Sequence, residues 1–144
     1  MVNRNVNENI KVYLDDDLVN ISLHRDTGIV NLTWKASCGN LLDEEHSKEM
    51  EEIKRRMEKM KPKKLLVNLQ NCQYFLSPKK YAWYNFTLFS LFGRSQPQAL
   101  AFVAPSNLFN QLAFEANLES TKKHRTKVQY FRDHEKAEKW LERE

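Results

Sequence analysis

Glycine and proline are scarce in this sequence, with only 3 Gly and 4 Pro among 144 residues. These low counts of glycine and proline exclude a collagen-like chain, a linker-rich chain and a turn-rich all-β design. The low glycine count also removes most glycine-based phosphate-binding loops. The two cysteines, Cys38 and Cys72, lack the Cys-x-x-Cys spacing, which predicts two reduced thiols.

Long apolar runs are also missing, since none approaches the roughly 18 residues that cross a bilayer. The polar, Asn-rich residues 1–10 do not resemble a signal peptide. We therefore expect a cytoplasmic protein with no membrane span. The length predicts a flexible N-terminus at residues 1–9 and a single domain over residues 10–144.

Charge of one sign does not dominate, because 23 Lys and Arg are interspersed with 19 Asp and Glu, for a net charge of +4. Backbone recognition of nucleic acid usually concentrates basic residues on one face. The basic cluster at residues 122–127 contains no aromatic residue on which a base could stack. We expect no nucleic-acid partner, and we interpret the surplus charge as a solubility feature.

Hydrophobic periodicity predicts a β-rich first third. Apolar and polar side chains alternate over residues 18–23 and 29–34, and residues 10–14 favour a strand. Turn residues at 15–17 and 26–28 separate these strands, and Gly28 tolerates a positive φ. The pattern predicts a three-stranded antiparallel meander.

A helix is predicted over residues 40–61, ended by Pro62. Its apolar stripe follows spacings of three and four, and consists of Leu42, His46, Met50, Ile53, Met57 and Met60. The charged face opposite this stripe is predicted to be solvated.

The rest of the chain alternates between strands and helices. Strands are predicted at residues 63–69, 99–103 and 127–131, the first two with nearly continuous apolar runs typical of covered strands. Helices are predicted over residues 78–92, after Ser106 and after Asp133, both of which can act as N-caps. The fold class is therefore α/β, a mixed sheet with an N-terminal antiparallel meander and βαβ crossovers.

Metal and catalytic motifs are sparse. The four histidines lie in four different predicted elements, without zinc-binding spacing, and no serine has a nucleophile-elbow context. Asp15, Asp16 and Asp17 could hold a cation, but no further ligands follow at EF-hand spacing, which favours a hairpin turn. We expect a protein that is not an enzyme and that has no metal and no cofactor.

Aromatic residues are the abundant feature, with 8 Phe, 5 Tyr and 3 Trp, half of them between Tyr74 and Phe92. Within the predicted helix at residues 78–92 they occupy every face, whereas a surface helix shows one apolar stripe. Either the helix is deeply packed or one face meets a partner or an apolar ligand. The candidate surface residues are Tyr74, Phe75, Tyr81, Trp83, Phe86, Phe89 and Phe92.

The stretch from Leu66 to Ser77 resembles the strand–loop–helix signature of STAS domains, the SpoIIAA-like anti-sigma-factor antagonists, and the chain's ending resembles the closing strand and helix of the SpoIIAA-like/SEC14-like branch. The resemblance implies a SpoIIAA-like arrangement of the mixed sheet and a regulatory role through protein binding. It also implies a phosphosite at Ser77, the one residue that carries over from the family's Asp-Ser-Ser-Gly-like context. Asn68 stands where the family has aspartate, and Ser77 before Pro78 also fits a plain helix N-cap.

We therefore expect a non-enzymatic, STAS-like protein-binding module that contacts its partner through residues 71–92. Two alternatives remain open at this point. The aromatic helix could bind an apolar small molecule or lipid, as the SEC14 kinship implies. The chain could also form a structural homodimer.

Overall fold

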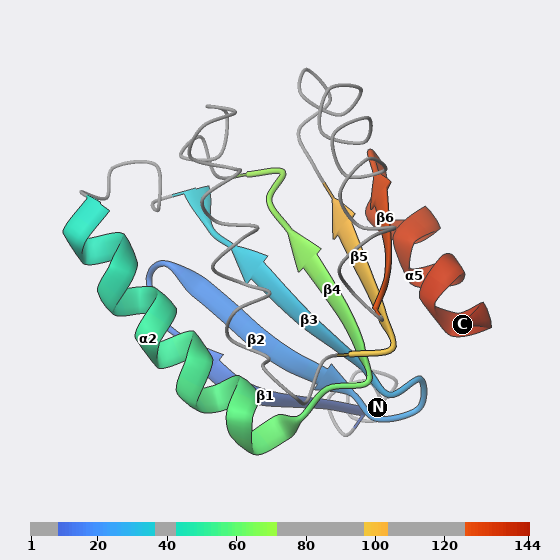
Figure 1. The fold of residues 1–144 in the computed structure, drawn as a ribbon, viewed down its shortest axis with the longest axis horizontal. Helices are drawn as coiled ribbons and strands as arrows, with labels where there is room; N and C mark the ends of the chain where they lie inside the picture. Colours follow the sequence, from blue (N-terminus) through green and yellow to red (C-terminus); the bar gives the residue numbers. More distant parts are fainter. Residues whose placement is uncertain (1–8, 37–42, 72–96, 104–125) are drawn as a thin grey trace, which may run out of the picture.

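The computed structural model describes residues 9–36, 43–71, 97–103 and 126–144. These residues form one six-stranded sheet and two helices (Figure 1). In chain order the elements are β1 (Ile10–Asp15), β2 (Val19–His24), β3 (Ile29–Trp34), α2 (Asp43–Met60), β4 (Lys64–Asn68), β5 (Ala99–Val103), β6 (Lys127–Phe131) and α5 (His134–Arg143).

The strands lie in the sheet in the same order as in the chain. β1, β2 and β3 pair antiparallel, and β3, β4, β5 and β6 pair parallel. The predicted α/β class, with an antiparallel meander followed by crossover strands, is confirmed. A strand that pairs in parallel with the one before it must start at the same end of the sheet. The chain therefore has to return to that end, and α2 makes this return between β3 and β4.

One face of the sheet packs against α2, which crosses over the β1–β3 side in Figure 1. Four members of the predicted stripe, Met50, Ile53, Met57 and Met60, pack into this core, whereas Leu42 lies outside the described residues. The buried members of this α2-side core are Val19, Ile21, Val30, Leu32, Trp34, Met50, Ile53, Met57, Leu65, Val67, Leu69, Leu100, Phe102 and Tyr130.

The opposite face packs against α5 over the parallel half of the sheet. Strand residues alternate between the two cores, so Leu65 lies in the α2-side core while Leu66 lies in the α5-side core. The buried members of this α5-side core are Ile29, Leu66, Ala99, Ala101, Val103, Ala137 and Leu141. β5 is buried at every residue, as its continuous apolar run predicted.

β3 corrects one expectation. Its alternation of apolar residues with Asn31 and Thr33 predicted a half-buried strand with a polar side open to water. Instead Asn31 is buried, because α2 covers one face of β3 and α5 packs against the other. Alternation therefore marks which side chains share a face, but it did not identify the face that water reaches.

Two positive φ angles end local elements. Gly28 closes the β2–β3 hairpin with φ +74°, and its N–H donates to the carbonyl of His24. Lys61 follows α2 with φ +46°, a position usually held by glycine, and Pro62 comes next. The helix was predicted to run to residue 61, directly before Pro62, and α2 ends one residue earlier, at Met60.

The N-terminus of α5 is capped by Asp133, as predicted. Its Oδ1 accepts hydrogen bonds from the N–H groups of Glu135 at 2.7 Å and Lys136 at 3.4 Å. Replacing Asp133 with alanine leaves these donors without the cap, so we expect the free energy of unfolding to fall by about 1 kcal/mol.

Urea unfolding followed by far-UV circular dichroism measures this change. Lys136→Ala is the matched control, because Lys136 is exposed and its backbone N–H remains. We expect the control to change stability by less than about 0.5 kcal/mol. An equal loss in both variants would contradict the capping role.

Candidate functional site

The residues predicted from the aromatic segment lie outside the described part of the chain. This holds for Ser77, the implied phosphosite, and for the whole candidate surface: Tyr74, Phe75, Tyr81, Trp83, Phe86, Phe89 and Phe92. What the structure does place is the point from which this segment starts, at the end of β4.

The end of β4 is tied to the ends of its neighbours. The N–H of Leu69 donates to the carbonyl of Val103 at 2.9 Å, just past the β4–β5 ladder. The Gln70 side-chain Nε2 donates to the carbonyl of Arg132 at 2.7 Å, beyond the end of β6. The Asn68 side-chain Oδ1 accepts from the N–H of Gln70 at 3.0 Å. The chain therefore leaves β4 at a fixed place, with Gln70 and Asn71 exposed.

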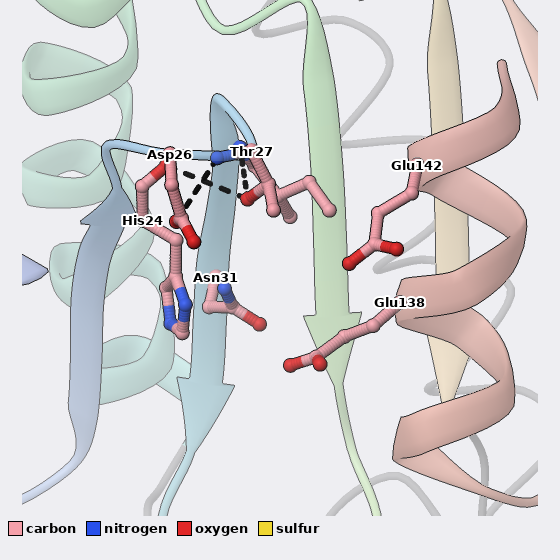
Figure 2. A pocket seen from close by; sticks show the side chains of 7 residues that line it. His24, Asp26, Thr27, Asn31, Glu138 and Glu142 are labelled. Atoms are coloured by element: carbon pink, nitrogen blue, oxygen red, sulfur yellow. Dashed lines mark hydrogen bonds between the residues drawn. The ribbon is translucent and has the colours of Figure 1, made fainter. Parts of the chain in front are cut away.

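A pocket of about 160 Å³ lies on the other side of the molecule, between the β2–β3 hairpin and α5 (Figure 2). Polar side chains make up most of its wall. The lining residues are His24, Asp26, Thr27, Ile29, Asn31, Glu138 and Glu142. In Figure 2 the carboxylates of Glu138 and Glu142 point from α5 toward β3 and the hairpin, and the amide of Asn31 projects from β3 toward α5.

The hairpin wall of this pocket is held by local hydrogen bonds. Asp26 Oδ1 accepts from the N–H of Thr27 at 3.0 Å. The Thr27 hydroxyl donates to the carbonyl of His24 at 3.5 Å and accepts from the N–H of Ile29 at 3.3 Å. These bonds fix the turn and leave the His24 imidazole directed along the sheet, on the side of Asn31 (Figure 2).

Asn31 is the least satisfied group in this pocket. It is 5% exposed, and neither Oδ1 nor Nδ2 has a hydrogen-bond partner within the described part of the chain. A buried amide without partners costs about 1–3 kcal/mol of stability. A group kept at that cost and placed in a pocket wall is a candidate for ligand contact.

The α5 wall of the pocket is acidic. Glu138 and Glu142 are four residues apart, so both project from the same face of the helix. Glu138 Oε1 lies 3.3 Å from Nδ1 of His134, one turn earlier. The backbone carbonyl of Glu142 accepts from Lys64 Nζ at 3.4 Å. The Glu142 carboxylate itself forms no ion pair with a described residue.

A second cluster of carboxylates joins the β1–β2 turn to α2. Asp16 caps the turn, as its Oδ1 accepts from the N–H groups of Leu18 and Val19, both at 2.8 Å. Its carboxyl also shares a hydrogen bond with that of Glu49 on α2. A turn follows β1 as predicted, but it spans residues 16–18, because Asp15 still belongs to β1. Lys35 Nζ contacts Asp15 Oδ1 at 2.7 Å beside it.

The two carboxyls of this cluster have pKa values shifted in opposite directions. Burial, the hydrogen bond that the protonated Glu49 carboxyl donates to Asp16 and the negative charges of Asp16 and Glu52 raise the pKa of Glu49 to about 8. For Asp16, burial alone would raise the pKa. The hydrogen bonds with Glu49, Leu18 and Val19, together with the charge of Lys35, outweigh burial and lower it. Near neutral pH the pair therefore shares one proton, held on Glu49.

Sequence analysis did not identify either of these clusters. The pocket joins residues 24–31 to residues 138–142, which are adjacent only because α5 folds back over β3, β4 and β5. The one available signal was the Glu138–Glu142 spacing, which is common on solvated helices. The partner of Asp16 lies on a helix whose charged face was predicted to be solvated, so nothing in the sequence marked Glu49.

Comparisons of the chain with protein-family models, with curated proteins and with solved structures give no match in any of the three. Among the described residues, no group of three or more His, Cys, Asp or Glu side chains is arranged to hold a metal ion. Neither described helix combines the length and the apolar character required to cross a membrane.

Proposed function

We propose that the chain is a non-enzymatic, regulatory module of the STAS/SpoIIAA-like type that binds a partner protein through residues 71–92. The observation that carries this proposal is the anchored end of β4. Hydrogen bonds from Leu69 to Val103 and from Gln70 to Arg132 give the proposed surface a rigid starting point at the carboxyl edge of the parallel strands. Binding residues are typically carried on segments that a rigid scaffold positions in this way.

The strand order supports a contact surface over a cofactor crevice. In doubly wound α/β sheets, ligands bind where the strand order reverses and two connections diverge. The six described strands follow chain order without a reversal, so the parallel half of this sheet forms no such crevice. Recognition at its carboxyl edge then depends on what the connecting segments present, and the 71–92 segment is the most aromatic of them.

The edges of the sheet favour the same assignment. Partners can also bind by adding a strand to an open edge. β1 has a register irregularity between Val12 and Leu14, and an irregular edge of this kind resists strand addition. At the other edge, β6 is five residues long and begins with an exposed lysine, Lys127. Neither edge offers the long, flat strand that an added partner would need.

The experiment places a photo-crosslinking amino acid at one of two positions. Asn71 lies just beyond the carboxyl end of β4, and Lys63 lies just before its amino end. Both residues are exposed, so the two variants are matched in accessibility. We expect a protein that crosslinks from position 71 and not from position 63. That protein is then purified and titrated against the wild type, Asn71→Arg and Lys63→Glu.

The expected result is a loss of affinity of about ten-fold for Asn71→Arg, because an arginine at the contact clashes or is desolvated, and no change for Lys63→Glu. Equal effects of the two substitutions would contradict the assigned surface. Native mass spectrometry of the purified chain adds an independent readout. A co-purifying apolar ligand or a dimer without a partner would replace this proposal with one of the two alternatives.

A further inference from the structure

The pocket between the β2–β3 hairpin and α5 has no role in the partner surface proposed above. It lies at the β3 side of α5, whereas the 71–92 segment starts from the end of β4. Its wall combines three carboxylates with a buried amide that has no partner among the described residues.

We propose that this pocket binds a small organic cation, an ammonium or guanidinium group with a hydrogen-bond acceptor beside it. The charge follows from the wall. Asp26, Glu138 and Glu142 place three carboxylates around one small volume, and these repel an anion and attract a cation. The Glu142 carboxylate in particular forms no ion pair with a described residue, since Lys64 Nζ contacts the backbone carbonyl of Glu142 instead.

The need for an acceptor follows from Asn31. Its side chain offers one acceptor, Oδ1, and two donors on Nδ2, and both atoms are without partners in the described part of the chain. A bare cation can donate to Oδ1 but cannot accept from Nδ2. A ligand that carries a hydroxyl or carbonyl oxygen next to its cationic group satisfies both atoms.

The size of the pocket limits the ligand further. Its volume of about 160 Å³ is close to that of an engineered cavity, about 150 Å³, that admits a benzene ring. A molecule of that size is an amino alcohol or an amino amide, and a nucleotide is far too large. The arrangement also differs from a metal site, because the described residues contain no group of ligands arranged to hold a metal ion.

The test is a titration of the ¹⁵N-labelled full chain, followed by NMR at the side-chain amide resonances of Asn31. The probes are ethanolamine, ethylamine and ethylene glycol, at constant pH and ionic strength. Ethanolamine carries both the charge and the acceptor, ethylamine carries only the charge, and ethylene glycol carries only oxygens. We expect a saturable shift of the Asn31 resonances with ethanolamine, a weaker affinity for ethylamine and no saturation with ethylene glycol.

Two variants of α5 separate the pocket from general attraction of cations. Glu142→Gln removes one pocket carboxylate, and we expect the affinity for ethanolamine to fall about ten-fold. Glu135→Gln removes a carboxylate from the same helix whose side chain is 76% exposed and pairs with Lys139, outside the pocket. We expect that control to bind as the wild type does.

Asn31→Leu removes the amide while keeping a similar volume, and it should abolish the binding of ethanolamine. Circular dichroism shows whether this variant folds, and Glu142→Gln tests the site independently if it does not. Three results would overturn the proposal: unshifted Asn31 resonances with ethanolamine, equal binding of ethylene glycol, or equal weakening by Glu135→Gln. Unshifted resonances would identify Asn31 as an amide satisfied by water only.

Discussion

Replacing Phe102 with alanine is expected to lower the free energy of unfolding by about 4 kcal/mol. Phe102 lies in β5, between β4 and β6, and is 0% exposed in the α2-side core. Its ring stacks on that of Tyr130, with centroids 5.0 Å apart and planes 14° from parallel. Removing the ring forfeits its transfer free energy, leaves a cavity and breaks this aromatic pair.

Equilibrium unfolding in urea measures the loss, with intrinsic fluorescence and circular dichroism as two probes. Val12→Ala is the control, because Val12 is also an apolar strand residue but is 55% exposed. We expect the control to stay within about 0.5 kcal/mol of the wild type. A domain of this size has about 5–15 kcal/mol of stability, so the Phe102 variant should remain folded but marginal. A loss below about 1 kcal/mol would show that Phe102 is not in a packed core.

Because of Glu49, we expect the free energy of unfolding to fall as the pH rises. Its pKa is about 8 in the folded chain and near the ordinary value of 4.5 when unfolded. Between these two values the folded state holds a proton that the unfolded state has released, so stability falls as the pH rises through this range. The Glu49→Gln variant cannot lose that proton, and its amide can still donate to Asp16. At pH 8.5 we expect it to exceed the wild type by about 2 kcal/mol, a value discounted because the carboxyl is only partly buried.

Urea unfolding at pH 5, 6.5 and 8.5 compares the two proteins. At pH 5 the wild type is protonated at Glu49 and the two should agree within about 0.5 kcal/mol; the difference should then grow with pH. Glu58→Gln serves as the control, since Glu58 is exposed on the same helix. Its stability should follow that of the wild type at every pH. Parallel curves for the wild type and Glu49→Gln would contradict the shared proton.

The fold was predicted well where periodicity decides the structure. Alternation at residues 18–23 and 29–34 located β2 and β3 to within one residue, and the apolar run at residues 99–103 gave β5 with its bounds. The stripe ending at Met60 located the body of α2. These patterns are local, because each arises from side chains that share a face within one element.

The candidate sites could not be predicted, because they depend on contacts between distant elements. Asn31 looked like an ordinary polar residue of a half-buried strand until α5 packed against its face of the sheet. Glu49 looked like a solvated helix charge until α2 met the turn at Asp16. The environments of Asn31 and Glu49 are decided by which elements pack together. Such long-range packing produces no periodic pattern of apolar residues in the sequence. The binding surface formed by the aromatic residues at 74–92 remains a prediction, because those residues lie outside the described part of the chain.

The order of the strands also governs how this sheet comes apart. Each strand bonds only to its neighbours in the chain, so detaching β1 breaks a single ladder and leaves the other four intact. If the two chain ends were pulled apart, we expect these ladders to break one after another and not all at once. Amide hydrogens should therefore exchange fastest in β1 and slowest around β4, where both neighbours must open first.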